Sequence, residues 1–202
     1  MEKRKGLKIS FNSPAVLVFA LICVIAQVLN QVTHGASNLT LFSVYRASLA
    51  NPLTYVRCVT HVFGHADWGH LMNNLMLLLI LGPMLEEKYG TVNLVVVMAV
   101  TAVVTGIVNM LFFPGIALLG ASGIVFAMIL LSSITSAEAG TVPLTFIIVA
   151  VVYIGQQVYQ GLFVADNISQ MGHIVGGLVG SVLGFVMNRH SMGRYQKRRS
   201  DL

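Results

Sequence analysis

Long apolar stretches alternate with short polar breaks along this chain. A helix needs roughly 20 apolar residues to cross a bilayer, and about 17 are enough where the membrane is thin. By this measure we expect six membrane-spanning helices, near residues 14–31, 70–86, 92–112, 121–137, 142–160 and 171–188. The pattern therefore predicts an all-α polytopic membrane protein, whose fifth span has a more polar second half than the others.

Charged residues and turn formers fill the breaks. Residues 86–90 end the second span with charge and a glycine, and the sequences at 113–115 and 138–140 end the third and fourth. The longest break, about 31–69, has enough polar residues to form short amphipathic helices at the membrane interface. We find no internal repeat, so the chain is expected to form one membrane domain.

Composition supports a membrane protein. Of the 202 residues, 56% are hydrophobic and 9% are charged, and the mean hydropathy is +0.81. Soluble domains carry about 25% charged residues because their surface faces water. Most of this protein's surface must therefore face lipid, which excludes a soluble globular domain.

The net charge of +5 comes from two end clusters of cations. They comprise Lys3, Arg4, Lys5 and Lys8 at the start, and Arg189, Arg194, Lys197, Arg198 and Arg199 at the end. Clusters that flank spans mark cytoplasmic ends and favour anionic lipid surfaces over nucleic acid. With six spans, all 12 Lys and Arg residues except Arg46 and Arg57 fall on the inner side.

We accordingly expect a basic cytoplasmic N-terminus at 1–13, a membrane domain at 14–188 and a basic cytoplasmic tail at 189–202. The first apolar stretch lacks a convincing cleavage site, so it is interpreted as a retained span. The expected location is a bacterial plasma membrane, with both termini cytoplasmic.

Four polar residues stand at the start of even-numbered spans. His70 and Asn74 fall in the opening turns of the second span, Ser122 opens the fourth, and His173 lies near the start of the sixth. All four therefore lie at a similar depth below the outer surface. Polar side chains at membrane depth are costly unless they face the bundle interior, so they are functional candidates.

Ser122 and His173 together are the minimum for activating a hydroxyl nucleophile, since imidazole can accept the proton as oxygen attacks a carbonyl. Close contact between their helices is plausible because small residues flank both; these are Gly120 and Gly123 in one, and Gly172, Gly176, Gly180 and Gly184 in the other. The Ser122 N–H, at a helix N-terminus, and the side chains of His70 and Asn74 are candidate donors to an oxyanion.

These motifs together resemble the rhomboid family of intramembrane proteases over about residues 50–188. The matching motifs are the nucleophile segment 120–123, the base segment starting at Gly172, His70 with Asn74 four residues later, the end of the second span at 81–90, and Arg57 in the first loop. The resemblance implies a six-transmembrane-helix rhomboid-like bundle. At two positions the chain departs from the family pattern: Phe126 replaces a tyrosine that packs on the catalytic imidazole, and Val56 replaces an aromatic residue.

The resemblance further implies catalysis by Ser122 and His173 without a catalytic acid, through an acyl-enzyme intermediate and without a cofactor. His70 and Asn74 would form the oxyanion hole, with Gly120, Gly123, Phe126, Gly172 and Gly176 in support. Substrates would be transmembrane proteins, cleaved near their outer ends after passing the fifth helix. The substrate and the oligomeric state stay open.

Other interpretations compete for the same residues. His61, His65 and His70 lack the spacing of a zinc site, so no metal site is expected, and His65 is interpreted as bracing the first loop. Asp166, in a short external loop, is expected to be solvated rather than catalytic. For the whole chain, the alternatives are an inactive rhomboid-like binder of membrane helices and a transporter that uses the polar residues as a relay.

Overall fold

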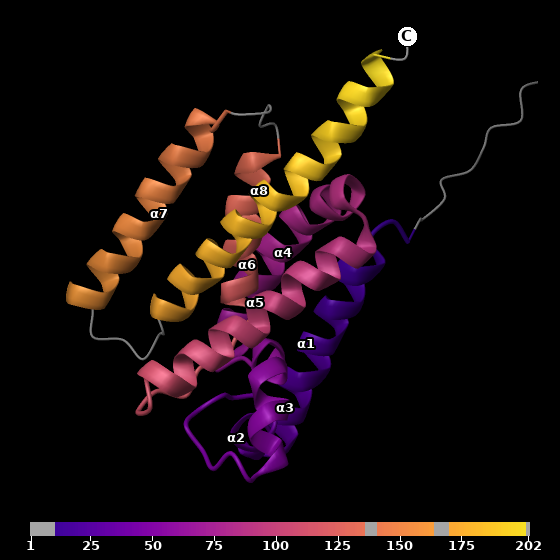
Figure 1. Cartoon of the computed structure of the whole chain (residues 1–202). Helices are drawn as coiled ribbons and strands as arrows, with labels where there is room; N and C mark the ends of the chain where they lie inside the picture. The colour runs from indigo at the N-terminus through magenta and orange to yellow at the C-terminus, as the bar shows by residue number, and fades with distance from the viewer. Residues whose placement is uncertain (1–10, 136–140, 164–169, 201–202) are drawn as a thin grey trace, which may run out of the picture.

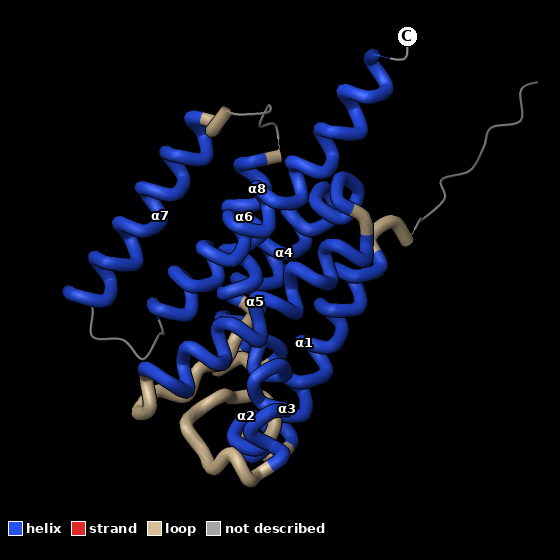
Figure 2. The backbone as a smooth tube through the Cα atoms, in the orientation of Figure 1, coloured by secondary structure: helices blue, strands red, loops and turns tan. Residues whose placement is uncertain are grey.

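The computed structural model describes residues 11–135, 141–163 and 170–200. Within these residues the chain is helical, without strands, apart from one isolated antiparallel bridge between Val44 and Leu118 (Figure 2). The helices are α1 (Pro14–Val32), α2 (Ala36–Thr40), α3 (Pro52–Thr60), η1 (His61–Phe63), α4 (Trp68–Tyr89), α5 (Thr91–Phe112), α6 (Ser122–Ile134), α7 (Leu144–Phe163) and α8 (Gln170–Ser200).

Each of the six predicted apolar stretches coincides with one helix. By length and composition α1, α4 and α5 are suited to cross a membrane, and shorter apolar helical stretches lie at Ser122–Ile134, Leu144–Gln156 and Gly172–Met187. The predicted interfacial segment forms α2, α3 and η1. One boundary differs from prediction, since α8 continues as a helix to Ser200. Its last turns are rich in Arg, Lys, Met and Gln, which favour helix even where the sequence is no longer apolar.

Helix α6 occupies the interior of the bundle, where it contacts α4, α5, α7 and α8. Many of its side chains are fully buried, among them Ile124, Met128 and Leu131. The short helices α2 and α3 gather at one end of the bundle, where α4, α6 and α8 also begin (Figure 1). We call this the loop end. It brings the beginnings of the three helices that carry the predicted site residues to one end of the molecule.

Helices α6 and α8 pack backbone against backbone. A Cβ atom added to Gly176 would lie 2.7 Å from Cα of Gly123, and one added to Gly180 would lie 2.7 Å from the carbonyl carbon of Ala127. No side chain fits at either position without a shift of the helices. The predicted glycine stripe is therefore what permits this contact.

At the opposite end of the bundle, α1 is fixed to α4 by a buried carboxylate. Glu86 of α4 accepts hydrogen bonds from Ala15 N–H (3.0 Å), Val16 N–H (3.2 Å) and the Thr91 hydroxyl (2.8 Å). The first N–H groups of a helix have no partner within it, and a negative charge there is favourable. The sequence predicted Glu86 only as part of a charged helix end, whereas the structure buries it as a cap.

Candidate functional site

Ser122 is the first residue of α6 and is buried, with 9% of its surface exposed. The backbone turns sharply just before it, because Gly120 has φ = +119°, a conformation that side chains other than glycine's rarely permit. A Cβ atom at Gly120 would also lie 2.9 Å from the His70 ring. Gly120 is thus required both by its backbone conformation and by the closeness of His70.

The segment before the serine, residues 116–121, is here called the serine loop. The loop between α1 and α4 holds its backbone by four hydrogen bonds, three to backbone atoms and one to a side chain. Leu118 exchanges two backbone hydrogen bonds with Val44, each 2.9 Å. Gly120 N–H donates to the His61 carbonyl (2.9 Å), and Ala121 N–H donates to Nε2 of His65 (3.4 Å). The next N–H, that of Ser122, donates no hydrogen bond within the described part of the chain. It is the first unpaired amide of α6.

His70 and Asn74 lie on one face of α4 and both approach the serine loop. Asp67 caps the helix by accepting from His70 N–H at 2.8 Å. The amide nitrogen of Asn74 lies 3.8 Å from where a Gly120 Cβ would stand. Asn74 is 6% exposed, and its Nδ2 has no hydrogen-bond partner among the described residues. A buried amide donor without a partner is unfavourable, which makes it suited to a ligand oxygen.

His173 lies in the first turn of α8, next to Gly172, and is half-buried. The Gly172 carbonyl oxygen lies 3.4 Å from the Cβ position of Gly123, the residue after the serine. The ring of Phe126, one turn along α6 from Ser122, lies 4.7 Å from the His173 ring between centroids, at 45°. The beginnings of α6 and α8 are thus in contact at the level of Ser122 and His173.

Phe126 also contacts a residue that the sequence did not single out. The ring of Tyr153 in α7 lies 4.1 Å from that of Phe126, so Phe126 has aromatic contacts on both α7 and α8. The Tyr153 hydroxyl is buried and has no hydrogen-bond partner within the described residues. Nothing in the sequence relates position 153 to position 126, because aromatic residues are common throughout the spans.

Two histidines of the first loop, His61 and His65, are buried. His61 contacts the Thr105 hydroxyl through Nε2 (3.3 Å) and the Arg57 carbonyl through Nδ1 (3.2 Å). Burial lowers the pKa of both His61 and His65 to about 4, so both are neutral near pH 7. Among residues 11–135, 141–163 and 170–200, no three His, Cys, Asp or Glu side chains gather as they would to hold a metal ion. Asp166 lies outside the described residues.

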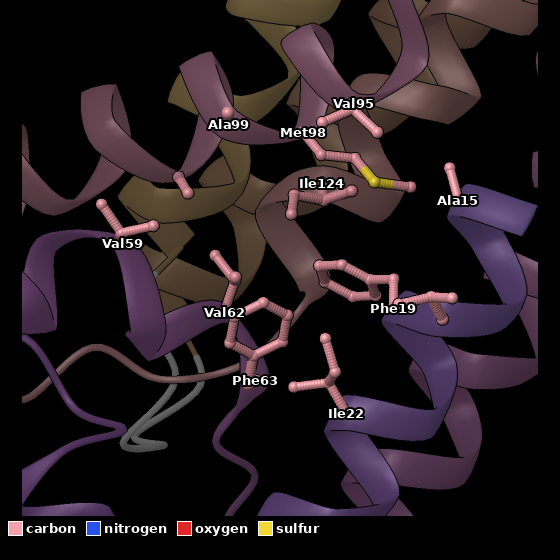
Figure 3. A pocket seen from close by; sticks show the side chains of 12 residues that line it. Ala15, Phe19, Ile22, Val59, Val62, Phe63, Val95, Met98, Ala99 and Ile124 are labelled. Atoms are coloured by element: carbon pink, nitrogen blue, oxygen red, sulfur yellow. The ribbon is translucent and has the colours of Figure 1, made fainter. Parts of the chain in front are cut away.

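An apolar pocket of about 220 Å³ lies beside this polar cluster, between α1, α5 and η1. In Figure 3 Phe19, Ile22, Val62, Phe63 and Ile124 converge on it from three parts of the chain. Its walls are almost wholly apolar, so it offers no group for acid–base or nucleophilic chemistry. The polar side chains predicted from the sequence lie around Ser122 instead.

Comparison with known proteins identifies the family of the chain. The Rhomboid domain family matches residues 52–190, more than half of the chain. Rhomboid protease GlpG of Haemophilus influenzae is 28% identical over 133 residues, covering 64% of this chain and 68% of the relative. Rhomboid-like protein 11, chloroplastic, of Arabidopsis thaliana is 27% identical over 145 residues, covering 65% of this chain. The chain spans about half the length of that plant protein, at 52%. Both the fold and the family match lead to one assignment: this chain is an integral membrane protein that belongs to the rhomboid family.

Proposed function

We propose that this protein is an intramembrane serine protease that cleaves transmembrane helices with Ser122 as nucleophile and His173 as general base. The observation that carries the proposal is the contact between the beginnings of α6 and α8. Gly123 meets the Gly172 carbonyl there, and Phe126 packs on His173. A nucleophile and its base must lie within hydrogen-bond reach, and this contact between the starts of their two helices supports the proposed pairing.

In the first half of the reaction, the Ser122 hydroxyl oxygen attacks the carbonyl carbon of the scissile peptide, and its proton passes to the His173 imidazole. The carbonyl oxygen becomes an oxyanion. As the intermediate collapses, the peptide C–N bond breaks, and His173 returns the proton to the departing amine. The product is an ester between Ser122 and the new carboxyl end of the substrate.

In the second half, a water molecule attacks this ester. His173 accepts a proton from the water, and the second oxyanion collapses with loss of Ser122 as leaving group. His173 then protonates the Ser122 oxygen, which restores the enzyme and releases the carboxylate product. A neutral imidazole is needed at the start of each half.

The oxyanion would be stabilised by three donors on this chain. The Ser122 N–H is the first unpaired amide of α6, and the Asn74 amide has no hydrogen-bond partner among the described residues. The His70 ring lies against Gly120, within the same cluster. Donors fixed in advance where charge develops are a large source of rate enhancement in acyl transfer.

The loop end would face the outer side of the membrane, because the basic ends of the chain mark the cytoplasmic side. Cleavage would then occur near the outer end of the substrate helix. The host membrane proposed is a bacterial plasma membrane.

The test compares Ser122→Ala with Ser132→Ala, a substitution further along α6. The Ser132 hydroxyl only donates to the Ile129 carbonyl within its own helix (2.7 Å). We expect Ser122→Ala to abolish both cleavage of a model transmembrane substrate and labelling by a fluorophosphonate probe, while Ser132→Ala retains both. Mass spectrometry should place the label on Ser122. A folded wild-type protein that neither cleaves nor is labelled would favour an inactive binder of membrane helices.

A further inference from the structure

The His65 side chain is buried against the serine loop on one side and against His70 on the other. It has 0% exposure and comes from the loop between η1 and α4. Nε2 accepts from Ala121 N–H at 3.4 Å, and its ring meets the His70 ring edge-on, with centroids 5.0 Å apart. Its backbone is fixed as well, since Asn38 of α2 donates to the His65 carbonyl at 2.9 Å.

These contacts define one tautomer of His65. Nδ1 lies 3.1 Å from the Phe63 carbonyl oxygen, which can only accept a hydrogen bond. Nδ1 must therefore carry the proton, and Nε2 is left as the acceptor for Ala121 N–H. A second proton on His65 would sit on Nε2 and replace this hydrogen bond with a clash between two N–H groups.

We infer that His65 is a positioning residue for the proposed reaction, holding the peptide before Ser122 and the His70 ring at fixed places on either side of its neutral imidazole. This inference rests on the proposed function. His65 contacts one of the proposed oxyanion donors, His70, and binds the peptide N–H directly before another, the Ser122 N–H. By binding Ala121 N–H it also directs that amide away from the site, so that Ser122 N–H is the backbone donor.

The surroundings of His65 keep it neutral. Burial, and to a lesser degree a charge on His70, lower its pKa to about 4, while the Phe63 carbonyl and the Asp67 carboxylate act in the opposite direction. The other groups that hydrogen-bond to His65, the Asn38 amide of α2 and the Ala121 N–H of the serine loop, carry no charge. The titratable groups near it are therefore His70 and Asp67.

Two substitutions distinguish the role of Nε2 as a hydrogen-bond acceptor from the role of the ring in packing against His70. His65→Phe keeps a planar ring against His70 but removes the acceptor for Ala121 N–H. His65→Gln keeps an acceptor oxygen at similar reach. We expect His65→Phe to lower the rate of fluorophosphonate labelling of Ser122, and kcat for a transmembrane substrate, by about 100-fold with little change in KM. His65→Gln should recover both rates to within about tenfold of wild type.

Glu86→Gln serves as the control for lost stability. It weakens the cap between α1 and α4 at the far end of the bundle and contacts no residue of the site. We expect a lower Tm but an unchanged labelling rate per folded molecule. If His65→Phe slows labelling no more than Glu86→Gln does at equal loss of Tm, or if His65→Gln gives no recovery, His65 has only a structural role and the inference is wrong.

Two readouts do not depend on catalysis. Amide hydrogen exchange across residues 118–121 should be faster in His65→Phe than in wild type or Glu86→Gln, and unchanged exchange would overturn the inference.

The second readout is the dependence of protein stability on pH. A buried neutral histidine stabilises the fold fully above its unfolded pKa of about 6.5, and this stability is lost as pH falls towards 4. The drop in Tm between pH 7 and 5 should be smaller in His65→Gln, and an equal drop would count against the assigned neutral imidazole.

Failure of the proposed function has a different signature. Wild-type protein without labelling at Ser122 would overturn the protease assignment and with it the catalytic part of this inference. Wild type labelled at Ser122, with His65→Phe labelled equally fast, would overturn the inference alone.

Discussion

Helices α7 and α8 both contact α6, but they do so by different means. Helix α8 meets it backbone to backbone at Gly176 and Gly180, where no Cβ atom would fit. Helix α7 stands at the edge of the bundle (Figure 1) and contacts α6 and α8 through aromatic side chains. At Gly155 of α7, an added Cβ would meet nothing within 4 Å. The spacing of α6 and α8 is thus set by contact between backbones, whereas the contacts of α7 described here are between side chains.

This difference matches what the proposed reaction requires. Ser122 and His173 come from the pair with fixed spacing, where small shifts would separate nucleophile from base. Residues on α7 contribute aromatic contacts instead, from Tyr153 to Phe126 and from Phe146 to Phe185 of α8. We therefore expect substitutions in the two interfaces to have effects of different size and kind.

The largest effect is expected from Gly176→Ala. The new methyl group would meet the Gly123 backbone, so α6 and α8 must move apart. Overpacking of this kind costs about 3 kcal/mol of unfolding free energy, and the displacement of His173 should lower fluorophosphonate labelling of Ser122 by about 100-fold. Thermal unfolding in detergent and the labelling rate measure the two effects.

The matched control is Gly155→Ala in α7. With open space around this position and a helical backbone, alanine should stabilise the protein by roughly 0.5–1 kcal/mol and leave labelling unchanged. Equal losses from both substitutions would mean that α7 and α8 are held to α6 in the same way.

An intermediate effect is expected from Phe126→Ala, because this ring touches both interfaces. It removes the contacts with His173 at 4.7 Å and Tyr153 at 4.1 Å. For a half-buried ring we expect a loss of about 2 kcal/mol. Labelling of Ser122 should fall about tenfold because the His173 ring loses its support. Phe126→Tyr, which keeps the ring, should behave like wild type, and labelling that persists in Phe126→Ala would show that the ring does not orient His173.

The smallest effect is expected from Phe146→Ala. Its ring meets Phe185 edge-on with centroids 5.3 Å apart, a contact between α7 and α8 remote from Ser122. Aromatic pairs of this kind contribute about 1 kcal/mol, so Tm should fall slightly and labelling should stay unchanged. A large loss of labelling would show instead that the position of α7 affects the site directly.

Much of this arrangement could be predicted from the sequence because it depends on local patterns. The apolar stretches located the six predicted spans, and the turn residues at 86–90 and 113–115 located the ends of α4 and α5. The placement of His70, Asn74, Ser122 and His173 near helix starts follows from the same pattern.

The rest depends on pairings between distant segments that no local pattern encodes. Glu86 looked like an ordinary charged helix end, yet it caps a helix 71 residues earlier in the chain. His65 was predicted to brace the first loop, but its contact with Ala121 is fixed only once α4 and α6 pack together. Tyr153 contacts Phe126 because of the rotation of α7 about its axis, and the apolar residues around position 153 in the sequence do not indicate which side of α7 faces α6.

The Glu86 cap also has a consequence for how the protein is made. The amides of Ala15 and Val16 leave the ribosome long before the carboxylate that binds them, and translation proceeds at roughly 5–20 residues per second. Several seconds therefore pass in which the first helix is already synthesised but has no permanent partner at its start. The start of α1 can therefore dock in its final place only after the end of α4 has been synthesised. In this bundle a segment made late completes the packing of a segment made early.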